Sequence, residues 1–168
     1  WTSGSTATAA GIGASDESGC TVNICNCTID NIDVTGGVAG TVYGIYAGNY
    51  SNKTIKNNVV TQIGVNTTGG TKGNFGGVGG TTTASNNASA DSTAPGSGSL
   101  TSIVRGDNFN APNSGDYRPL NDSSPIFAAG ADLVTTPTGV NIDLTGRDRD
   151  SSGDTWTIGA YQLSVGGV

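Results

Sequence analysis

The sequence predicts an all-β protein, a parallel β-helix of a few coils with an irregular C-terminal cap. The first observation behind this prediction is a repeat. Residues 23–34 (NICNCTIDNIDV) and residues 54–65 (TIKNNVVTQIGV) carry the same pattern of apolar and amide residues, 31 positions apart. The second is composition, because 28 glycines and only 34% hydrophobic residues are typical of short strands and turns rather than of a helical bundle.

The repeat places equivalent residues in columns. Asn57 aligns with Asn26, and a weaker third copy in residues 82–91 (TTASNNASAD) places Asn86 in the same column. A period of roughly 20–50 residues indicates stacked repeats, and each copy here holds short runs of strand formers without a helical pattern. We expect the asparagines of this column to occupy tight bends and to form an amide ladder along the axis.

The second copy shows the expected strands most clearly, in residues 42–47, 54–55 and 59–65. Residues 69–80 (GGTKGNFGGVGG) are too rich in glycine for a regular strand, so we predict a loop that leaves the coil, with Phe75 folding back as a lid. The alternative all-β fold is a sandwich or jelly roll, which needs strands joined by hairpins. The register of 31 residues favours the β-helix.

The character of the sequence changes near residue 92. The C-terminal segments are residues 91–99 (DSTAPGSGS), residues 116–130 (DYRPLNDSSPIFAAG) and residues 143–161 (DLTGRDRDSSGDTWTIGAY). Their order resembles the C-terminal part of right-handed parallel β-helix proteins of bacterial and phage origin, the pectin-lyase-like proteins. The resemblance covers roughly residues 20–162 and implies a right-handed helix, but it says little about chemistry.

An open β-helix ends in unpaired strand edges and an exposed core, so its end needs a cover. We expect residues 116–130 to form a last irregular coil and residues 156–163 to form a strand that closes the end. The predicted organisation is therefore β-helix coils in residues 1–115, followed by the last coil and the C-terminal cap in residues 116–168.

The charge pattern excludes two classes of partner. The net charge is −6, and the seven Lys and Arg residues are scattered, so no basic cluster could neutralise a run of phosphates or an anionic membrane surface. No apolar run approaches the roughly 20 residues of a membrane span. We therefore expect neither nucleic-acid binding nor membrane insertion. Because the start lacks Met, Trp1 is not expected to be the biological start.

Two sets of residues are candidates for ligand binding. Asp148, Asp150 and Asp154 alternate near glycine, and carboxylate oxygens suit Ca²⁺. The alternative is a solvated turn with Asp–Arg pairs, and no other cofactor is expected. Tyr46 and Tyr50 lie beside one coil, where their rings could flank a groove and stack on sugars. Tyr43 lies on or beside the same coil, and the alternative for the three tyrosines is that one packs under the loop while the others cover the coil surface.

The residues favour no catalytic constellation. The chain has no His, which excludes a Ser–His–Asp triad, and no spacing of aspartates places two on one face for glycoside hydrolysis. Lys53 and Lys56 lie beside the coil without an acidic cluster. The three cysteines of residues 20–27 (CTVNICNC) suggest neither a disulfide framework nor a zinc site, so we expect some of them to be small buried side chains.

Together with the resemblance, these observations favour a non-enzymatic structural or recognition module. We expect a phage virion protein, such as a fibre, spike or decoration protein used in host attachment, located on the virion or outside cells. Its expected partners are other virion proteins, copies of itself in a homo-oligomer such as a trimer, and surface polysaccharide. The alternative is a secreted carbohydrate-active protein, which would be a polysaccharide lyase, a hydrolase or a sugar-binding module.

Overall fold

The structure is a computed structural model that describes residues 8–14, 20–34, 40–48, 52–67, 69–79, 82–134, 140–149 and 155–163. The coils contain β1 (Thr8–Gly13), β2 (Thr21–Cys25), β3 (Thr28–Ile32), β4 (Thr41–Tyr46), β5 (Asn52–Lys56), β6 (Val59–Ile63), β7 (Thr71–Gly76), β8 (Thr82–Ser85) and β9 (Ala88–Ser89). They are followed by α1 (Arg105–Asn108), β10 (Phe109–Ala111), the 3₁₀ turn η1 (Pro112–Ser114) and β11 (Asp116–Pro119). Within these ranges, no helix has the length and apolar character needed to cross a membrane.

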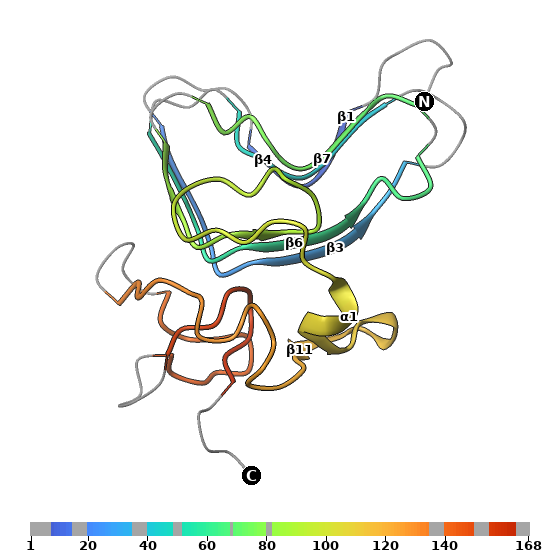
Figure 1. The fold of residues 1–168 in the computed structure, drawn as a ribbon. Coiled ribbons are helices and arrows are strands. Elements are labelled where there is room, and N and C mark those ends of the chain that lie inside the picture. The colour runs from blue at the N-terminus through green and yellow to red at the C-terminus, as the bar shows by residue number, and fades with distance from the viewer. Residues whose placement is uncertain are drawn as a thin grey trace.

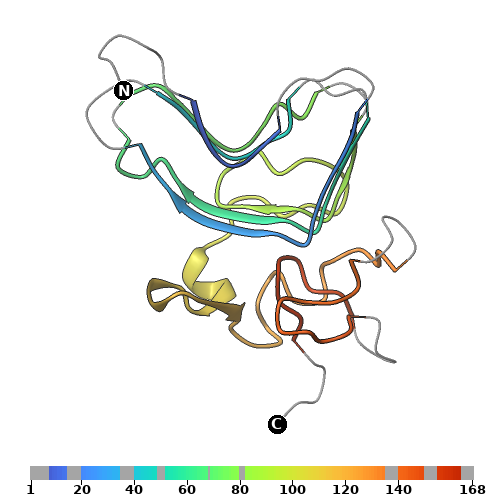
Figure 2. The same cartoon turned by 180° about the vertical axis from the view of Figure 1, so that it is seen from behind.

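Successive coils contribute one strand each to three parallel sheets, β1-β4-β7, β2-β5-β8 and β3-β6-β9. In Figure 1 the chain turns anticlockwise from β4 at the top to β6 at the bottom. Figure 2, seen from behind, brings the blue first coil to the front, so the coils advance towards the viewer of Figure 1. That advance is right-handed, and the prediction of a right-handed parallel β-helix is confirmed.

The register of the strands reproduces the columns inferred from the repeat. Ile24 pairs with Ile55, and Ile55 pairs in turn with Ala84. In the third sheet, Ile29 pairs with Val60. Paired residues of neighbouring strands point to the same face, so these columns fill the interior of the coil, where Ile55 and Val60 are inaccessible to solvent. Burial of each such side chain stabilises the fold by roughly 1.5–3 kcal/mol.

The first sheet bends inward where β1 and β4 carry the aligned glycines Gly11 and Gly44. Figures 1 and 2 both show the sheet β1-β4-β7 as a V whose apex approaches the third sheet. A Cβ atom at Gly44 would lie 2.1 Å from Cγ1 of Val60, and one at Gly11 would lie 2.7 Å from Cγ2 of Ile29. Glycine at the apex therefore allows the two sheets to approach each other this closely.

The prediction of a loop over residues 69–80 is wrong for its central part. Residues Thr71–Gly76 form β7, which pairs with β4. Phe75 is not a lid, because it pairs with Ile45 and is buried in the core. Pairing with β4 and burial of Phe75 outweigh the low strand propensity of the glycines.

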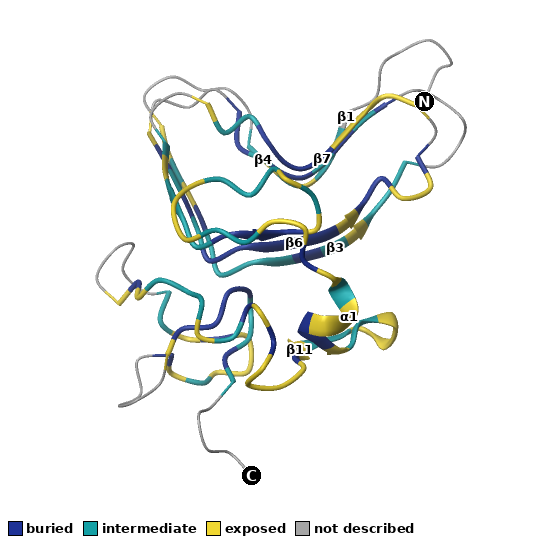
Figure 3. Cartoon of the chain, viewed as in Figure 1, coloured by how far each residue is buried: buried dark blue, intermediate teal, exposed yellow. Residues whose placement is uncertain are grey.

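The third sheet is covered on both faces. Val60 and Ile63 of β6 belong to the coil interior, whereas Val59 packs in a second core with Ile126 and Ile158 of the C-terminal region. The strand β6 is accordingly buried along most of its length, as Figure 3 shows. The C-terminal region thus packs on the outer face of this sheet, beside the coils (Figure 1).

The stack continues only in part beyond β9. Isolated parallel bridges join Ser85 to Ser97 and Ala88 to Leu100, so residues 92–103 form a half coil. The chain then leaves the stack through α1, and β10 pairs with β11 in an antiparallel manner.

The closing strand predicted for residues 156–163 is not present, since this segment is irregular. The N–H of Ile158 donates to the carbonyl of Ile126, and the N–H of Gly159 donates to the carbonyl of Asn57. These N–H groups therefore find their acceptors in carbonyl groups of turns and bends, not in the edge of a strand. The division of the chain between residues 115 and 116 stays a prediction.

Candidate functional site

Tyr43 and Tyr46 form a pair of stacked rings on the outer face of the first sheet. Their ring centroids are 5.4 Å apart, and the angle between the ring planes is 25°. Gly44 and Ile45 both face the interior, so the tyrosines on either side of them emerge on the same outer face. Both tyrosines are half-buried and keep part of their surface in solvent.

Glycines that follow in the next coil form the floor beneath these rings. A Cβ atom at Gly76 would lie 2.5 Å from Cε1 of Tyr43, and one at Gly77 would lie 3.1 Å from Cε2 of Tyr46. The rings therefore rest on bare backbone. We call Tyr43, Tyr46 and these glycines the tyrosine surface. Flat aromatic faces that remain partly exposed can stack on apolar faces of a ligand.

Sequence reasoning assigned Tyr46 and Tyr50 to one site. The structure places Tyr46 on the tyrosine surface, and Tyr50 lies outside the described residues. The stacking partner of Tyr46 is Tyr43, which sequence reasoning placed on or beside the same coil but not in the binding site. The available signal was the order Tyr-Gly-Ile-Tyr, but using it required the knowledge that the strand bends at Gly44.

The asparagines Asn26, Asn57 and Asn86 occupy the bend between the second and third sheets. Their φ angles are 54°, 56° and 52°, in the left-handed region that Asn tolerates. Their side-chain amides donate to carbonyl groups of the C-terminal region, at Val140, Ala131 and Ala129 respectively, over 2.8, 2.7 and 2.9 Å. This column therefore fastens the C-terminal region to all three coils.

The amide ladder along the axis occurs in the neighbouring column. Nδ2 of Asn58 donates to Oδ1 of Asn87 over 3.0 Å, and both residues are inaccessible to solvent. Oδ1 of Asn58 accepts the N–H of Cys27 over 3.1 Å. Within this buried column, the low dielectric strengthens each hydrogen bond. The amide ladder expected for the column of Asn57 and Asn86 thus lies in the column of the residues that follow them, Asn58 and Asn87.

The predicted calcium site is described only at Asp148. Its Oδ1 accepts the side-chain amide of Asn141 over 3.4 Å, while Asp150 and Asp154 lie outside the described residues. Among the residues that the structure describes, no three His, Cys, Asp or Glu side chains form a cluster suited to a metal ion. Calcium binding at the three aspartates therefore stays a prediction.

Asp143, next to this segment, holds a turn. Its carboxylate accepts the N–H groups of Thr145, Arg147 and Gln162 over 2.8, 2.9 and 2.9 Å. Burial alone would raise the pKa of Asp143, but these donors and the Thr145 hydroxyl outweigh it, so the pKa lies below its ordinary value. At neutral pH the carboxylate is therefore ionised, and its oxygens are already hydrogen-bonded within the fold.

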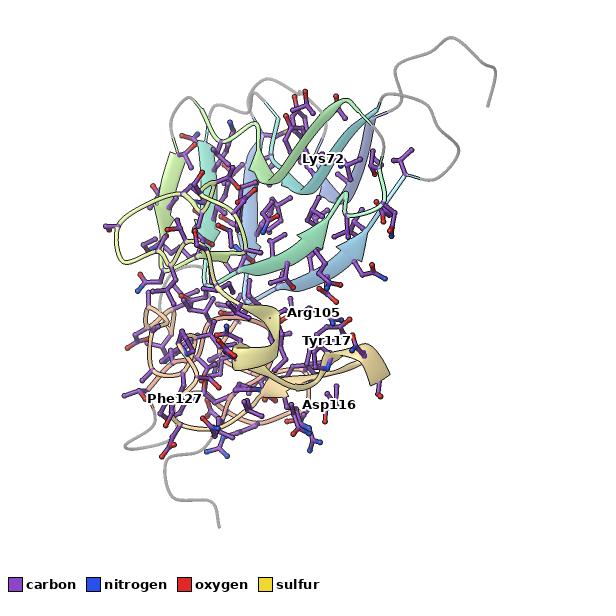
Figure 4. All side chains as sticks on the ribbon, turned by 45° about the vertical axis from the view of Figure 1, so that its right-hand side comes forward. Lys72, Arg105, Asp116, Tyr117 and Phe127 are labelled. Carbon is purple, nitrogen blue, oxygen red and sulfur yellow. The ribbon has the colours of Figure 1, made fainter. Side chains whose placement is uncertain are left out.

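Asp30 ties the third sheet to the hairpin that follows α1. Its carboxylate accepts Nη2 of Arg105 over 2.6 Å, the hydroxyl of Tyr117 over 2.9 Å and the hydroxyl of Thr61 over 2.6 Å. Figure 4 shows the labelled side chains of Arg105 and Tyr117 next to each other, below the sheets of the coils. With its side chain only 2% exposed and every donor within the fold, Asp30 acts as a structural anchor.

Other carboxylates hold loops in the same manner. Asp33 accepts hydrogen bonds from the side chains of Asn66 and Thr67. Asp91 accepts hydrogen bonds from the backbone N–H of Asn74 and the hydroxyl of Thr93. Asp116 accepts hydrogen bonds from the side chains of Arg118 and Asn110. These bonds, the one from Arg118 most of all, hold the pKa of Asp116 well below the usual range. An acid that stays ionised in this way is a poor proton donor.

Lys53 is buried, and its ammonium group donates to the carbonyls of Gly77 and Gly79 over 2.9 and 2.6 Å. It therefore secures the turn after β7.

The cysteines are free thiols, and burial raises the pKa of Cys25 to about 11 and also raises the pKa of Cys27. Both thiols are therefore protonated at neutral pH and weakly nucleophilic.

Comparisons with known proteins give no relative from which a function could be transferred. No protein-family description, curated protein or solved structure matches the chain.

Proposed function

We propose that this chain is a non-enzymatic recognition module, a β-helical part of a phage fibre, spike or decoration protein, which binds a surface polysaccharide. The observation that carries the proposal is the tyrosine surface, where two stacked and partly exposed rings lie on a glycine floor. Aromatic faces provide flat apolar area with little conformational entropy to lose, which suits the C–H face of a sugar ring.

The roles of the carboxylates support recognition rather than hydrolysis. Asp30 and Asp143 are occupied by several donors from the fold, and Asp116 is paired with Arg118. Hydrolysis of a glycosidic bond needs one carboxyl group that can give up a proton to the leaving group. Acids that hold loops as carboxylates serve this purpose poorly.

The assignment to pectin-lyase-like proteins of virions is part of the same proposal. Its support is the order of the C-terminal segments together with the observed stack of right-handed parallel coils. In this setting the module works outside cells. It assembles with other virion proteins or with copies of itself, for example as a trimer.

The experiment is a binding titration of the chain by calorimetry against a panel of neutral and acidic bacterial polysaccharides. The double variant Tyr43→Ala/Tyr46→Ala should lose roughly tenfold or more in affinity, since each stacked ring contributes about 1 kcal/mol. Tyr161→Ala, which removes a half-buried tyrosine of the C-terminal region, is the matched control and should bind normally.

Two results would overturn the proposal. One is binding that is unchanged in the double variant while its circular dichroism matches that of the unmodified chain. The other is the appearance of new reducing ends or unsaturated products during incubation with the panel, which would establish the alternative, a secreted carbohydrate-active enzyme.

A further inference from the structure

The two ends of the β-helix are built differently. At the C-terminal end the half coil of residues 92–103 lies on the last strands, where the N–H of Asn86 donates to the carbonyl of Ser97 and the N–H of Ser89 to that of Leu100. At the N-terminal end, β1, β2 and β3 are each the first strand of a sheet, so within the described residues each has a strand neighbour on one side only.

Lys72 protects the part of the C-terminal end that the half coil leaves open. It pairs with Val42, a fully buried residue of the interior, so its side chain points inward. A Cβ atom at Gly64 would lie 2.9 Å from Cδ of Lys72, which shows that the lysine stem crosses towards the end of β6. Lys72, labelled in Figure 4, is exposed and lines a groove of about 380 Å³ with Ile63 and Asp91.

An inward-pointing charge is a common device against edge-to-edge pairing, because a further strand would have to bury it. The described strands of the N-terminal edge carry no such inward-pointing charge. Ala9 occupies the position that Lys72 has in the last coil. The strands β1, β2 and β3 contain no Pro, Lys, Arg or Glu, and their one charged residue, Asp30, is already held by Arg105.

The residues of the interior columns are more exposed in the first coil than in the second. In the second coil, Ile45, Ile55 and Val60 are completely buried. Their partners in the first coil keep some exposure: Ile24 is 5% exposed, Ile29 is 8% exposed, and Ile12 is only half-buried. Among the described residues, the apolar columns thus reach the N-terminal edge without a further strand above them.

We propose that the edge formed by β1, β2 and β3 is an interface for one further parallel β-helix coil. The coil that fits has three short strands, an apolar inward row above Ile12, Ile24 and Ile29, and no charge facing the edge. The amide ladder does not extend to it, because Cys27 takes the ladder position in the first coil and its thiol donates to its own neighbour, the carbonyl of Cys25. Strand hydrogen bonds and apolar contacts therefore hold the added coil.

The test supplies such a coil from the chain itself. In an extended chain, a copy of residues 41–70 replaces residues 1–7, so that Gly70 of the copy joins Thr8 as Gly70 joins Thr71 in the natural sequence. Thr8, Thr41 and Thr71 are paired in register, so this junction preserves the repeat. Hydrogen exchange at the edge-facing amides of β2 and β3 should slow by roughly tenfold or more relative to the unextended chain.

A matched control carries Val42→Lys and Ile55→Lys in the added copy only, and it should leave that exchange fast. Protection of the β5 and β6 amides reports in every sample that the original coils are folded. The proposal is overturned if the extended chain gives no added protection while β5 and β6 stay protected. It is also overturned if the edge amides of the unextended chain are already protected as strongly as those of β5. A dimer of the unextended chain in sedimentation, which would assign the edge to a second copy, overturns it as well. The readout is hydrogen exchange in β2 and β3, so it does not depend on whether the tyrosine surface binds a polysaccharide.

Discussion

Asn58 and Asn87, 29 residues apart in the sequence, share a hydrogen bond of 3.0 Å between fully buried side-chain amides. Asn58 also donates to the carbonyl of Ile24 over 2.8 Å. Each asparagine thus reaches back to the coil before it, and the ladder joins all three coils inside the bend.

Replacement of Asn58 by Ala should therefore destabilise the fold strongly. It leaves the part-buried N–H of Cys27 and the buried carbonyl of Ile24 without their amide partner, and unpaired buried groups cost about 1–3 kcal/mol each. We expect a loss of about 2–5 kcal/mol in the free energy of unfolding, measured in urea. Asn52→Ala, at an exposed position of β5, is the control and should have little effect. Equal stability of the two variants would contradict the ladder.

Gly44→Ala should destabilise the chain because the new methyl group would meet Cγ1 of Val60 at 2.1 Å. Forcing the first and third sheets apart should lower the free energy of unfolding by about 2–4 kcal/mol. Gly106→Ala provides the contrast. No atom lies within 4 Å of a Cβ there, and Gly106 belongs to α1, so this variant should be neutral or slightly stabilised. A Gly44→Ala variant as stable as the unmodified chain would rule out the close approach at the apex.

Asp30→Ala should loosen the hairpin of β10 and β11 from the coils, because it leaves Nε and Nη2 of Arg105 and the hydroxyl of Tyr117 without their acceptor. Removing one partner of a largely buried pair costs about 3 kcal/mol. A double-mutant cycle with Arg105→Ala isolates the coupling between the two side chains. The account requires a clearly favourable coupling, and additive effects of the two variants would contradict it.

The stability of the chain should fall in acid partly because of Asp143. Its pKa in the folded state lies below the ordinary value of 3.8, so its contribution is present above that pH and disappears as the pH falls through the folded-state pKa. Asp143→Asn should therefore reduce the acid-dependent part of the unfolding curve, followed as the urea midpoint from about pH 6 to about pH 2. Asp122→Asn, at an exposed turn, serves as the control. An unchanged pH dependence in Asp143→Asn would show that the turn does not depend on the carboxylate.

The sequence predicted the coils well because their determinants are periodic. Ile24, Ile55 and Ala84 occupy one column in the sequence and one column in the structure. The strand β7 was missed because its glycines have low intrinsic strand propensity. The glycines of β7 provide room beside Tyr43, and only the three-dimensional arrangement reveals this need.

The C-terminal region was predicted less well for a different reason. Its position depends on single long-range hydrogen bonds, such as those from Asn26 to Val140 and from Asn57 to Ala131, and these have no periodic signature. The same holds for Tyr43, whose pairing with Tyr46 depends on a bend that the apex glycine allows. Local pattern therefore predicts the stack, while contacts on its outer surface require the structure.

The most direct test of the stacked coils is an NMR measurement of methyl–methyl contacts with isoleucine δ1 methyl labelling. The chain stacks its coils at the strand spacing of roughly 4.8 Å, so Ile24 should show a nuclear Overhauser contact with Ile55, and Ile12 with Ile45. The absence of a contact between Ile24 and Ile55, together with contacts that match antiparallel hairpins between facing sheets, would contradict the β-helix.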